Sequence, residues 1–264
     1  MRLLQIEYLP PGWTGKTYAC HRAAQEARGD WLLFVDADTR HHPFGPARAV
    51  AYAMAYGLDG LSLFLPNITS GTADRLALMV AFAAFFATTT PRRPFLNGQY
   101  ILLQRAAYWH SGGFSAVRRQ VTEDLALARQ LRECGCCVPV LRGDAAGHVR
   151  MYRETHQLWL GLSRFAIASL RWTGMGGLLA ILLIILLAAP LELLLVAMST
   201  GGLRTVIFSW LLSAFAMRNW AARFGGRGWA LLAPIGAMQV QVTSLWGIIR
   251  RLRGRGVHWK GRDL

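Results

Sequence analysis

The segment from Gly176 to Thr200 places the strongest constraint on how this chain can fold. It reads GGLLAILLIILLAAPLELLLVAMST, and its one charged residue is Glu192. A helix of about 20 apolar residues is long enough to cross the ~30 Å hydrocarbon core of a bilayer. We therefore expect a membrane-spanning helix here. Pro190 interrupts its pattern, and Glu192 is expected near one end of the span or against a partner helix.

Two further apolar segments follow, at residues 203–220 and 229–249. The segment at residues 229–249 is the weaker candidate for a membrane span, because it contains Pro234, Gln239 and Gln241. The last part of the chain, RRLRGRGVHWKGR, holds six basic residues, and the positive-inside rule places such a segment in the cytoplasm. If the N-terminal part is also cytoplasmic, the chain must cross the membrane an even number of times. Two membrane spans, with the third apolar segment interfacial or re-entrant, satisfy this condition. The number of crossings, two or three, stays open, and we expect a multi-pass protein of the cell (inner) membrane.

Charge and cysteine spacing exclude some classes of function. Residues 1–150 carry 16 Lys and Arg against 11 Asp and Glu, a net charge of +5, whereas residues 151–264 carry 13 against 3, a net charge of +10. The arginines flank apolar runs and form no patch with interleaved aromatics, so we expect no nucleic-acid partner. The cysteines lack a paired C-x-x-C spacing, which disfavours zinc and favours reduced thiols. They are Cys20, Cys134, Cys136 and Cys137.

Residues 1–150 alternate between strand-like and helix-like segments. The expected strands cover residues 2–9, 31–38, 58–66, 98–104 and 137–145. The expected helices cover residues 15–29, 43–57, 73–90 and 122–135, with a short helix after residue 104. Strands that alternate with helices predict an α/β fold with a mostly parallel sheet flanked by helices. The segment WLLFV, at residues 31–35, is expected to be buried on both faces.

The segment from Met151 to Trp172 predicts a helix that lies in the membrane interface. Apolar and small residues recur at helical spacing, and arginines flank them. The recurring residues are Leu158, Leu162, Phe165, Ser169 and Trp172. A soluble packing helix remains the alternative. The expected organisation is thus an N-terminal α/β domain at 1–150, an amphipathic interfacial helix at 151–174, and a transmembrane region with a basic cytoplasmic tail at 175–264.

Asp36 and Asp38 follow the apolar strand that starts at Trp31. Ligands of open α/β sheets bind beyond the carboxyl ends of the strands. On an extended chain the two side chains point to the same side, so their oxygens converge. Hard cations such as Mg²⁺ or Mn²⁺ prefer such ligands, and a bound diphosphate supplies further ones. A solvated turn or a helix cap is the alternative.

A second acidic pair, Glu123 and Asp124, opens the helix expected at 122–135. Thr122 is placed to cap this helix, and acids in a first turn are favourable for structural reasons alone. The functional interpretation makes one of the two carboxylates a general base for an acceptor hydroxyl.

The loop LPPGWTGKT places Lys16 where a Pro/Gly turn enters a helix. A helix N-terminus together with a lysine suits a phosphate group. The spacing does not match G-x-x-x-x-G-K-[ST], so hydrolysis of a nucleoside triphosphate is not indicated. An ordinary loop is the alternative.

Taken together, these segments resemble a membrane-bound family-2 glycosyltransferase with the A-type nucleotide-diphospho-sugar transferase fold. The matching text is LPPGWTGKTYAC, GDWLLFVDADTRHHP, the stretch from Asn97 to Gly135, RMYRETHQLWLGLSRF and the terminal VHWKGR. The nearest subgroup contains bacterial carotenoid- and hopanoid-associated glycosyltransferases. The resemblance also implies that the chain begins after the family's first strand unit.

The resemblance implies inverting transfer of one sugar from a nucleotide-diphosphate donor to a lipid-type acceptor such as a terpenoid or carotenoid. It assigns Asp38 and Asp36 to the metal (Mg²⁺ or Mn²⁺) and the diphosphate, and Lys16 to the donor. In the acidic pair of Glu123 and Asp124, it makes Asp124 the catalytic base. The acceptor is expected near Asn97, Gly98, Gln99 and Trp159.

Three other interpretations stay open. One is a truncated, non-catalytic membrane relative. Another is a polysaccharide synthase, although Ala168 stands where processive synthases of this family carry a glutamine before the Arg171–Trp172 pair. A transporter is disfavoured because the polar groups lie outside the apolar segments. The sugar, the nucleotide, the acceptor and the oligomeric state do not follow from the sequence.

Overall fold

The computed structural model describes residues 3–87, 95–120, 122–172, 175–200, 202–253, 258–259 and 262–263. The chain forms two compact units, each described by itself below. The first comprises Met1–Pro66 and Thr90–Val149, and the second comprises Asn67–Thr89 and Arg150–Leu264. Residues 67–89 group with the C-terminal helices, so each unit is built from two separate stretches of the chain.

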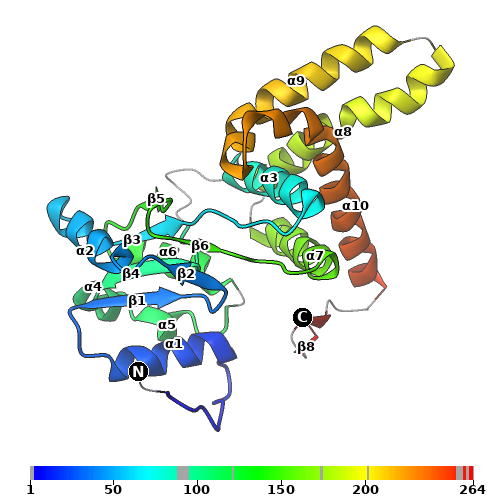
Figure 1. Ribbon diagram of the computed structural model, residues 1–264. Helices are drawn as coiled ribbons and strands as arrows, with labels where there is room; N and C mark the ends of the chain where they lie inside the picture. The colour runs from blue at the N-terminus through cyan, green and yellow to red at the C-terminus, as the bar shows by residue number, and fades with distance from the viewer. Residues whose placement is uncertain are drawn as a thin grey trace. The chain divides into compact units, whose positions relative to one another are not determined.

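A four-stranded sheet forms the centre of the first unit (Figure 1). Its order is β1-β4-β3-β5, and its strands are β1 (Trp31–Val35), β4 (Tyr100–Gln104), β3 (Gly60–Phe64) and β5 (Val140–Arg142). β4 runs antiparallel to both β1 and β3, whereas β3 and β5 are parallel. The sheet is therefore mixed, and the expectation of a mostly parallel sheet was wrong in this respect. The reason is that β4 lies between β1 and β3 with the opposite direction.

Helices flank both faces of this sheet. On one face, α1 (Gly15–Glu26), α4 (Arg105–His110), α5 (Gly113–Ala116) and α6 (Glu123–Glu133) enclose an apolar core. That core contains Ala24, Leu32, Ile101, Leu103, Phe114, Leu127 and Leu131. On the other face, α2 (Gly45–Ala55) and Leu61, Leu63 and Leu141 of the sheet line a cavity of about 330 Å³. A two-stranded ladder of β2 (Thr39–His41) and β6 (Gly147–Val149) follows the end of β1.

Two strand predictions differ from the structure. Residues 3–9, expected as a strand, form no helix or strand. β1 forms where expected but is not buried on both faces, since Leu32 is buried while Val35 is exposed. The cause is its edge position: among the described residues β1 pairs with β4 alone.

The second unit consists of helices. They are α3 (Thr72–Ala87), α7 (Thr155–Trp172), α8 (Met175–Thr200), α9 (Leu203–Ala221) and α10 (Ala233–Leu252), with the 3₁₀ turns η1 (Ala222–Phe224) and η2 (Arg227–Leu232). A two-residue ladder of β7 (His258–Trp259) and β8 (Arg262–Asp263) follows. α10 packs against α3, α7 and α8. A Cβ atom added to Gly236 would lie 2.5 Å from the carbonyl oxygen of Leu76, so glycine permits the close approach of α3.

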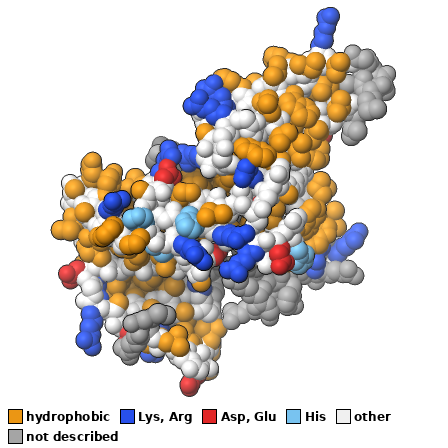
Figure 2. Space-filling view, in the orientation of Figure 1, with side chains coloured by type: hydrophobic (Ala, Val, Ile, Leu, Met, Phe, Trp, Pro, Cys, Tyr) orange, Lys and Arg blue, Asp and Glu red, His pale blue; other side chains and the backbone are white. Residues whose placement is uncertain are grey.

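The apolar helices remain exposed over much of their surface. Large hydrophobic side chains of α8 and α9 face outward, among them Leu186, Phe208 and Phe215 (Figure 2). Among the described residues, the segment Arg227–Leu252 is the one helix long and apolar enough to cross a membrane by length and composition. Leu179–Leu194 in α8 is a shorter apolar helix. This helix contains the apolar segment at residues 229–249, which the sequence marked as a weakened span. That segment therefore satisfies the criterion.

Candidate active site

Lys16 is placed by the loop that leads into α1. Thr14 caps this helix, and its Oγ1 accepts a hydrogen bond from the backbone N–H of Thr17 at 3.3 Å. The backbone N–H of Thr14 donates to the carbonyl oxygen of Arg118 at 2.9 Å, and the buried hydroxyl of Thr17 lies 3.0 Å from the same oxygen. The start of α1 is thereby attached to the segment that precedes α6.

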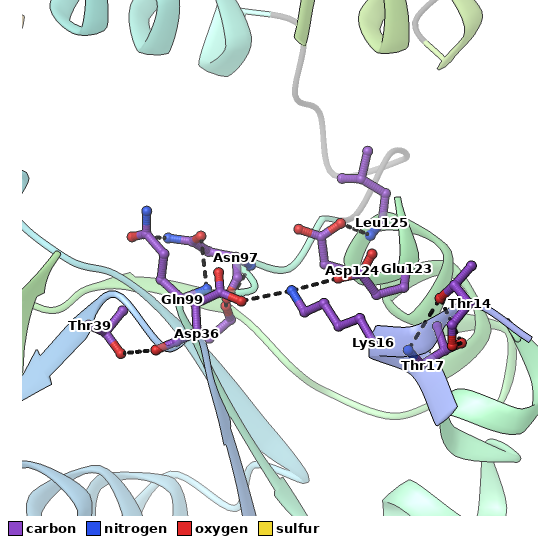
Figure 3. A network of polar contacts seen from close by, with 11 residues as sticks. Thr14, Lys16, Thr17, Asp36, Thr39, Asn97, Gln99, Glu123, Asp124 and Leu125 are labelled. Carbon is purple, nitrogen blue, oxygen red and sulfur yellow. Dashed lines mark hydrogen bonds and ion pairs between the residues drawn. The ribbon is translucent and has the colours of Figure 1, made fainter. Parts of the chain in front are cut away.

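Lys16 bridges the two acidic segments that the sequence singles out (Figure 3). Its Nζ atom lies 2.7 Å from Asp36 Oδ1 and 2.7 Å from Glu123 Oε1. Burial lowers the pKa of Lys16, but the charges of Glu123 and Asp36 outweigh this effect and raise the pKa above its ordinary value. The lysine therefore stays cationic at any physiological pH and neutralises both carboxylates.

The turn after β1 fixes Asp36. The N–H and the Oγ1 of Thr39 both contact the carbonyl oxygen of Asp36, at 3.2 and 2.6 Å. The chain therefore turns at residues 36–39, and the extended geometry assumed for Asp36 and Asp38 was wrong. Asp36 points to Lys16, while Asp38 is exposed on the turn.

His41 supports this turn from the neighbouring strand β2. Its Nε2 lies 2.9 Å from Thr39 Oγ1, whose single hydrogen goes to Asp36, so Nε2 carries the proton that is donated. The other ring nitrogen, Nδ1, is buried without a partner among the described residues, as is the hydroxyl of Tyr100. The two rings lie 5.4 Å apart. The sequence analysis did not identify His41 or Thr39, although both follow the acidic pair directly.

Glu123 and Asp124 form the first turn of α6, as expected. The predicted cap by Thr122 is wrong, because its side chain makes no capping hydrogen bond. Glu123 is 8% exposed and contacts Lys16, whereas Asp124 Oδ1 accepts the N–H of Leu125 at 2.9 Å. Burial and the neighbouring Glu123 charge raise the pKa of Asp124 to about 6, against the opposing effects of Lys16 and of the N–H groups of Leu125 and Gly98.

Gly98 lies at the point where these groups meet. A Cβ atom placed on it would lie 3.3 Å from Lys16 Nζ, 3.5 Å from Asp36 Oδ2 and 3.6 Å from Asp124 Oδ2. A lysine, a carboxylate of the first acidic pair and the carboxylate with the raised pKa thus surround one residue without a side chain. The salt bridge between Arg142 and Asp144, by comparison, joins one cation to one carboxylate.

Asn97 and Gln99 flank Gly98 and form hydrogen bonds to each other. The Nδ2 of Asn97 donates to the carbonyl oxygen of Leu63 at 3.1 Å and to Gln99 Oε1 at 3.0 Å, and its Oδ1 accepts the N–H of Gln99. The Asn97 amide is therefore occupied in shaping the loop. Trp159 belongs to the second unit, where its ring contacts that of Trp246 at 6.0 Å.

A metal ion fits this site only with help from a ligand. No group of three or more His, Cys, Asp or Glu side chains suited to a metal occurs among the described residues. If Asp36 and Asp38 held a metal ion at the end of β1, they would supply hard oxygen donors, and a bound molecule and water would have to fill the remaining coordination positions.

The first unit is thus an α/β domain with helices on both faces of its sheet and an acidic site beyond the end of β1. Residues 3–126 match the model of glycosyl transferase family 2, and this segment contains Lys16, Asp36, Asp38, Glu123 and Asp124. The match covers slightly less than half of the chain, and it makes this segment similar to that family.

Two other comparisons add less. The crystal structure of S. aureus TarS 1-349 in complex with UDP-GlcNAc is similar over 91% of this chain and 74% of that one, with 14% identity and a TM-score of 0.35. A TM-score this low does not place residues of one chain on the other. The search of curated proteins finds no match.

Proposed function

We propose that the protein transfers one sugar, with inversion, from a nucleotide-diphosphate donor to a hydroxyl or carboxyl group of a lipid-type acceptor, of the terpenoid or carotenoid kind. The observation that carries this proposal is the convergence of Lys16, Asp36 and Asp124 around Gly98, with Glu123 paired to Lys16. An in-line displacement of a diphosphate requires a base for the acceptor and positive charge or a metal ion for the leaving group. Asp124 can serve as the base, while Lys16 and the turn that carries Asp36 can serve the diphosphate.

The donor side of the site consists of Lys16 and the turn after β1. Lys16 holds Asp36 and Glu123 when no donor is bound, and a diphosphate offers it stronger anionic partners. Asp36 and Asp38 would hold Mg²⁺ or Mn²⁺, which neutralises the negative charge that develops on the leaving diphosphate. When Lys16 pairs with the diphosphate of the donor, it releases Asp36. Donor binding thereby frees this carboxylate to bind the metal ion.

The acceptor side is served by Asp124. Its carboxylate takes the proton of the acceptor O–H, the acceptor oxygen forms a bond to the anomeric carbon, and the bond from that carbon to the diphosphate oxygen breaks. A pKa of about 6 leaves the group ionised at neutral pH while it remains a stronger base than an ordinary aspartate. Glu123 raises this pKa and positions Lys16.

The lipid nature of the acceptor is supported by the second unit. Its helices expose large apolar side chains, and one of them satisfies the length and composition criterion for a membrane span. An acceptor dissolved in the bilayer would reach an enzyme held at the same membrane. We accordingly propose a multi-pass protein of the inner membrane with its first unit in the cytoplasm.

Transfer to a lipid product tests the proposal. The detergent-solubilised protein is incubated with radiolabelled UDP- and GDP-sugars, Mn²⁺ and a bacterial lipid extract. We expect label in the organic-solvent phase with wild type and none with Asp124→Asn. Equal label from the variant, or label only in water-soluble material, would contradict the proposed base or the proposed acceptor class.

A further inference from the structure

Three arginines gather at the turn between α9 and α10 in the second unit. Arg223 and Arg227 lie two residues before and after Gly225, which adopts φ 105°. The third is Arg75 of α3, whose Nη1 would lie 3.4 Å from a Cβ atom on Gly225. Arg223 lies in η1, Arg227 begins η2, and the guanidinium group of Arg75 in α3 approaches the glycine between them, whose left-handed conformation suits the turn.

Aromatic rings hold two of these guanidinium groups in place. The Cζ of Arg75 lies 4.5 Å from the ring centroid of Trp229, and the Cζ of Arg223 lies 5.0 Å from that of Trp220. Trp220 packs in turn against Phe86 of α3. Stacking on a ring uses the face of a guanidinium group and leaves the N–H groups at its edge available to an anion. In Arg75 the Nε donates to Thr69 Oγ1 at 3.3 Å, so its terminal N–H groups are the ones available.

No carboxylate within the described part of the chain neutralises these arginines. None of the three forms a salt bridge there, and the side chain of Asp74, next to Arg75, accepts the N–H groups of Ser70 and Gly71. The sequence has no Asp or Glu between Glu192 and Asp263. This segment therefore supplies no carboxylate to Arg223 or Arg227.

An apolar surface lies beside the cluster. η2 packs along α9, and the Nε1 of Trp210 donates to the carbonyl oxygen of Leu231 at 2.7 Å. Phe208 and Phe215 of α9 are 70% and 72% exposed, and Leu231 is 54% exposed. Unlike a soluble anion, a phospholipid satisfies both features, because its phosphate pairs with arginines while its acyl chains cover apolar side chains.

We propose that Arg75, Arg223 and Arg227 form a binding site for the phosphate headgroup of an anionic glycerophospholipid. The site is separate from the carboxylates around Gly98 and does not depend on sugar transfer. Each arginine near an anionic headgroup contributes roughly fivefold to affinity, so the three together contribute about 100-fold. Bound lipid also stabilises the native state by mass action.

Thermal unfolding of the full chain in dodecyl maltoside micelles tests this site. Phosphatidylglycerol or phosphatidylcholine is titrated into the micelles at equal mole fractions. We expect phosphatidylglycerol to raise the Tm of wild type by several degrees more than phosphatidylcholine. In the triple variant Arg75→Gln, Arg223→Gln, Arg227→Gln the apparent affinity for phosphatidylglycerol falls about 100-fold, and the corresponding triple Lys variant retains most of it.

A matched variant separates a site from general charge. Arg22→Gln, Arg28→Gln, Arg132→Gln removes three exposed arginines of the first unit and should respond to phosphatidylglycerol as wild type does. If the triple Gln variant does not fold, Arg223→Gln and Arg227→Gln alone should each lose about fivefold. Equal responses of wild type to both lipids, an unchanged response of these variants, or an equal response to inorganic phosphate would overturn the proposal.

Discussion

Lys16 Nζ lies 2.7 Å from Asp36 Oδ1, although Lys16 lies in the first turn of α1 and Asp36 follows β1, 20 residues further along the chain. The contact joins the start of α1 to the acidic turn after β1. Glu123 shares the same ammonium group, so a single cation holds both acidic segments of the site. This contact is the basis for most of the predictions below.

Replacement of Asp124 by Asn should abolish transfer and stabilise the protein. Loss of a general base typically lowers a rate by about 10² to 10⁴, while nucleotide binding should change little. Because the pKa of Asp124 is raised to about 6, its ionised form destabilises the native state above that pH, and Asn should add roughly 1–3 kcal/mol at pH 7.5. Rate assays, calorimetry and thermal unfolding check this, with the exposed Glu133→Gln at the other end of α6 as the control.

The pH dependence of transfer should report the ionisation of Asp124. The base acts in its deprotonated form, so the rate should fall about tenfold per pH unit below a midpoint near 6 and level off above it. Initial rates between pH 4.5 and 8.5 in buffers of constant ionic strength measure this. A midpoint close to that of an ordinary aspartate would show that another group serves as the base.

Lys16→Met should affect both binding and the pH profile. The variant leaves Asp36 and Glu123 without their shared cation, and we expect UDP or GDP affinity to fall at least about tenfold. Since Lys16 lowers the pKa of Asp124, its removal should also move the pH midpoint upward. Lys16→Arg keeps the charge and should leave the midpoint near that of wild type. A downward shift in Lys16→Met would contradict the assigned electrostatics.

Gly98→Ala should damage the site without unfolding the domain. The added methyl group would lie 3.3 to 3.6 Å from Lys16, Asp36 and Asp124, where a bound ligand has to fit. We expect transfer to fall at least about tenfold while the Tm stays within a few degrees, since these distances are close to van der Waals contact. Gly228→Ala, whose added methyl group meets nothing within 4 Å, serves as the control.

Two buried tyrosines should respond differently to loss of their hydroxyl groups. Tyr100 Oη has no hydrogen-bond partner among the described residues, whereas Tyr108 Oη accepts the N–H of Phe114 at 3.2 Å. Tyr100→Phe should therefore be neutral or stabilising, and Tyr108→Phe should cost about 1 kcal/mol. Urea unfolding of both variants measures the difference. A larger loss for Tyr100→Phe would show that its hydroxyl is hydrogen-bonded, for example through a water molecule to His41.

Local patterns in the sequence predicted most of the helices and strands of the central sheet layer in the first unit, but they predicted neither the absence of a strand at residues 3–9 nor the pairing of the strands. The apolar run at residues 31–35 and the amphipathic pattern after Thr122 mark β1 and α6 correctly. The place of β4 between β1 and β3 depends on contacts between residues distant in the chain, which no local period encodes. For the same reason the grouping of α3 with the C-terminal helices did not follow from its composition.

The candidate site shows the same division. Residue type and position singled out Lys16, Asp36 and Asp124, because charged residues directly beside an apolar strand or at a helix start indicate a functional site. Their convergence on Gly98, the shared use of Lys16 and the support of Asp36 by Thr39 and His41 are tertiary relationships. The proposed roles of all these residues, and those of Asp38, of a metal ion and of the acceptor-side residues, stay predictions.

Nucleotide binding tests the central claim most directly. Isothermal titration calorimetry of UDP and GDP into the purified full chain in detergent, with Mn²⁺ or with EDTA, requires no knowledge of the acceptor. The account predicts metal-dependent binding of one nucleotide, which Asp38→Ala abolishes and Lys16→Met weakens. A folded sample that binds neither nucleotide under any of these conditions would contradict a donor site at the end of β1.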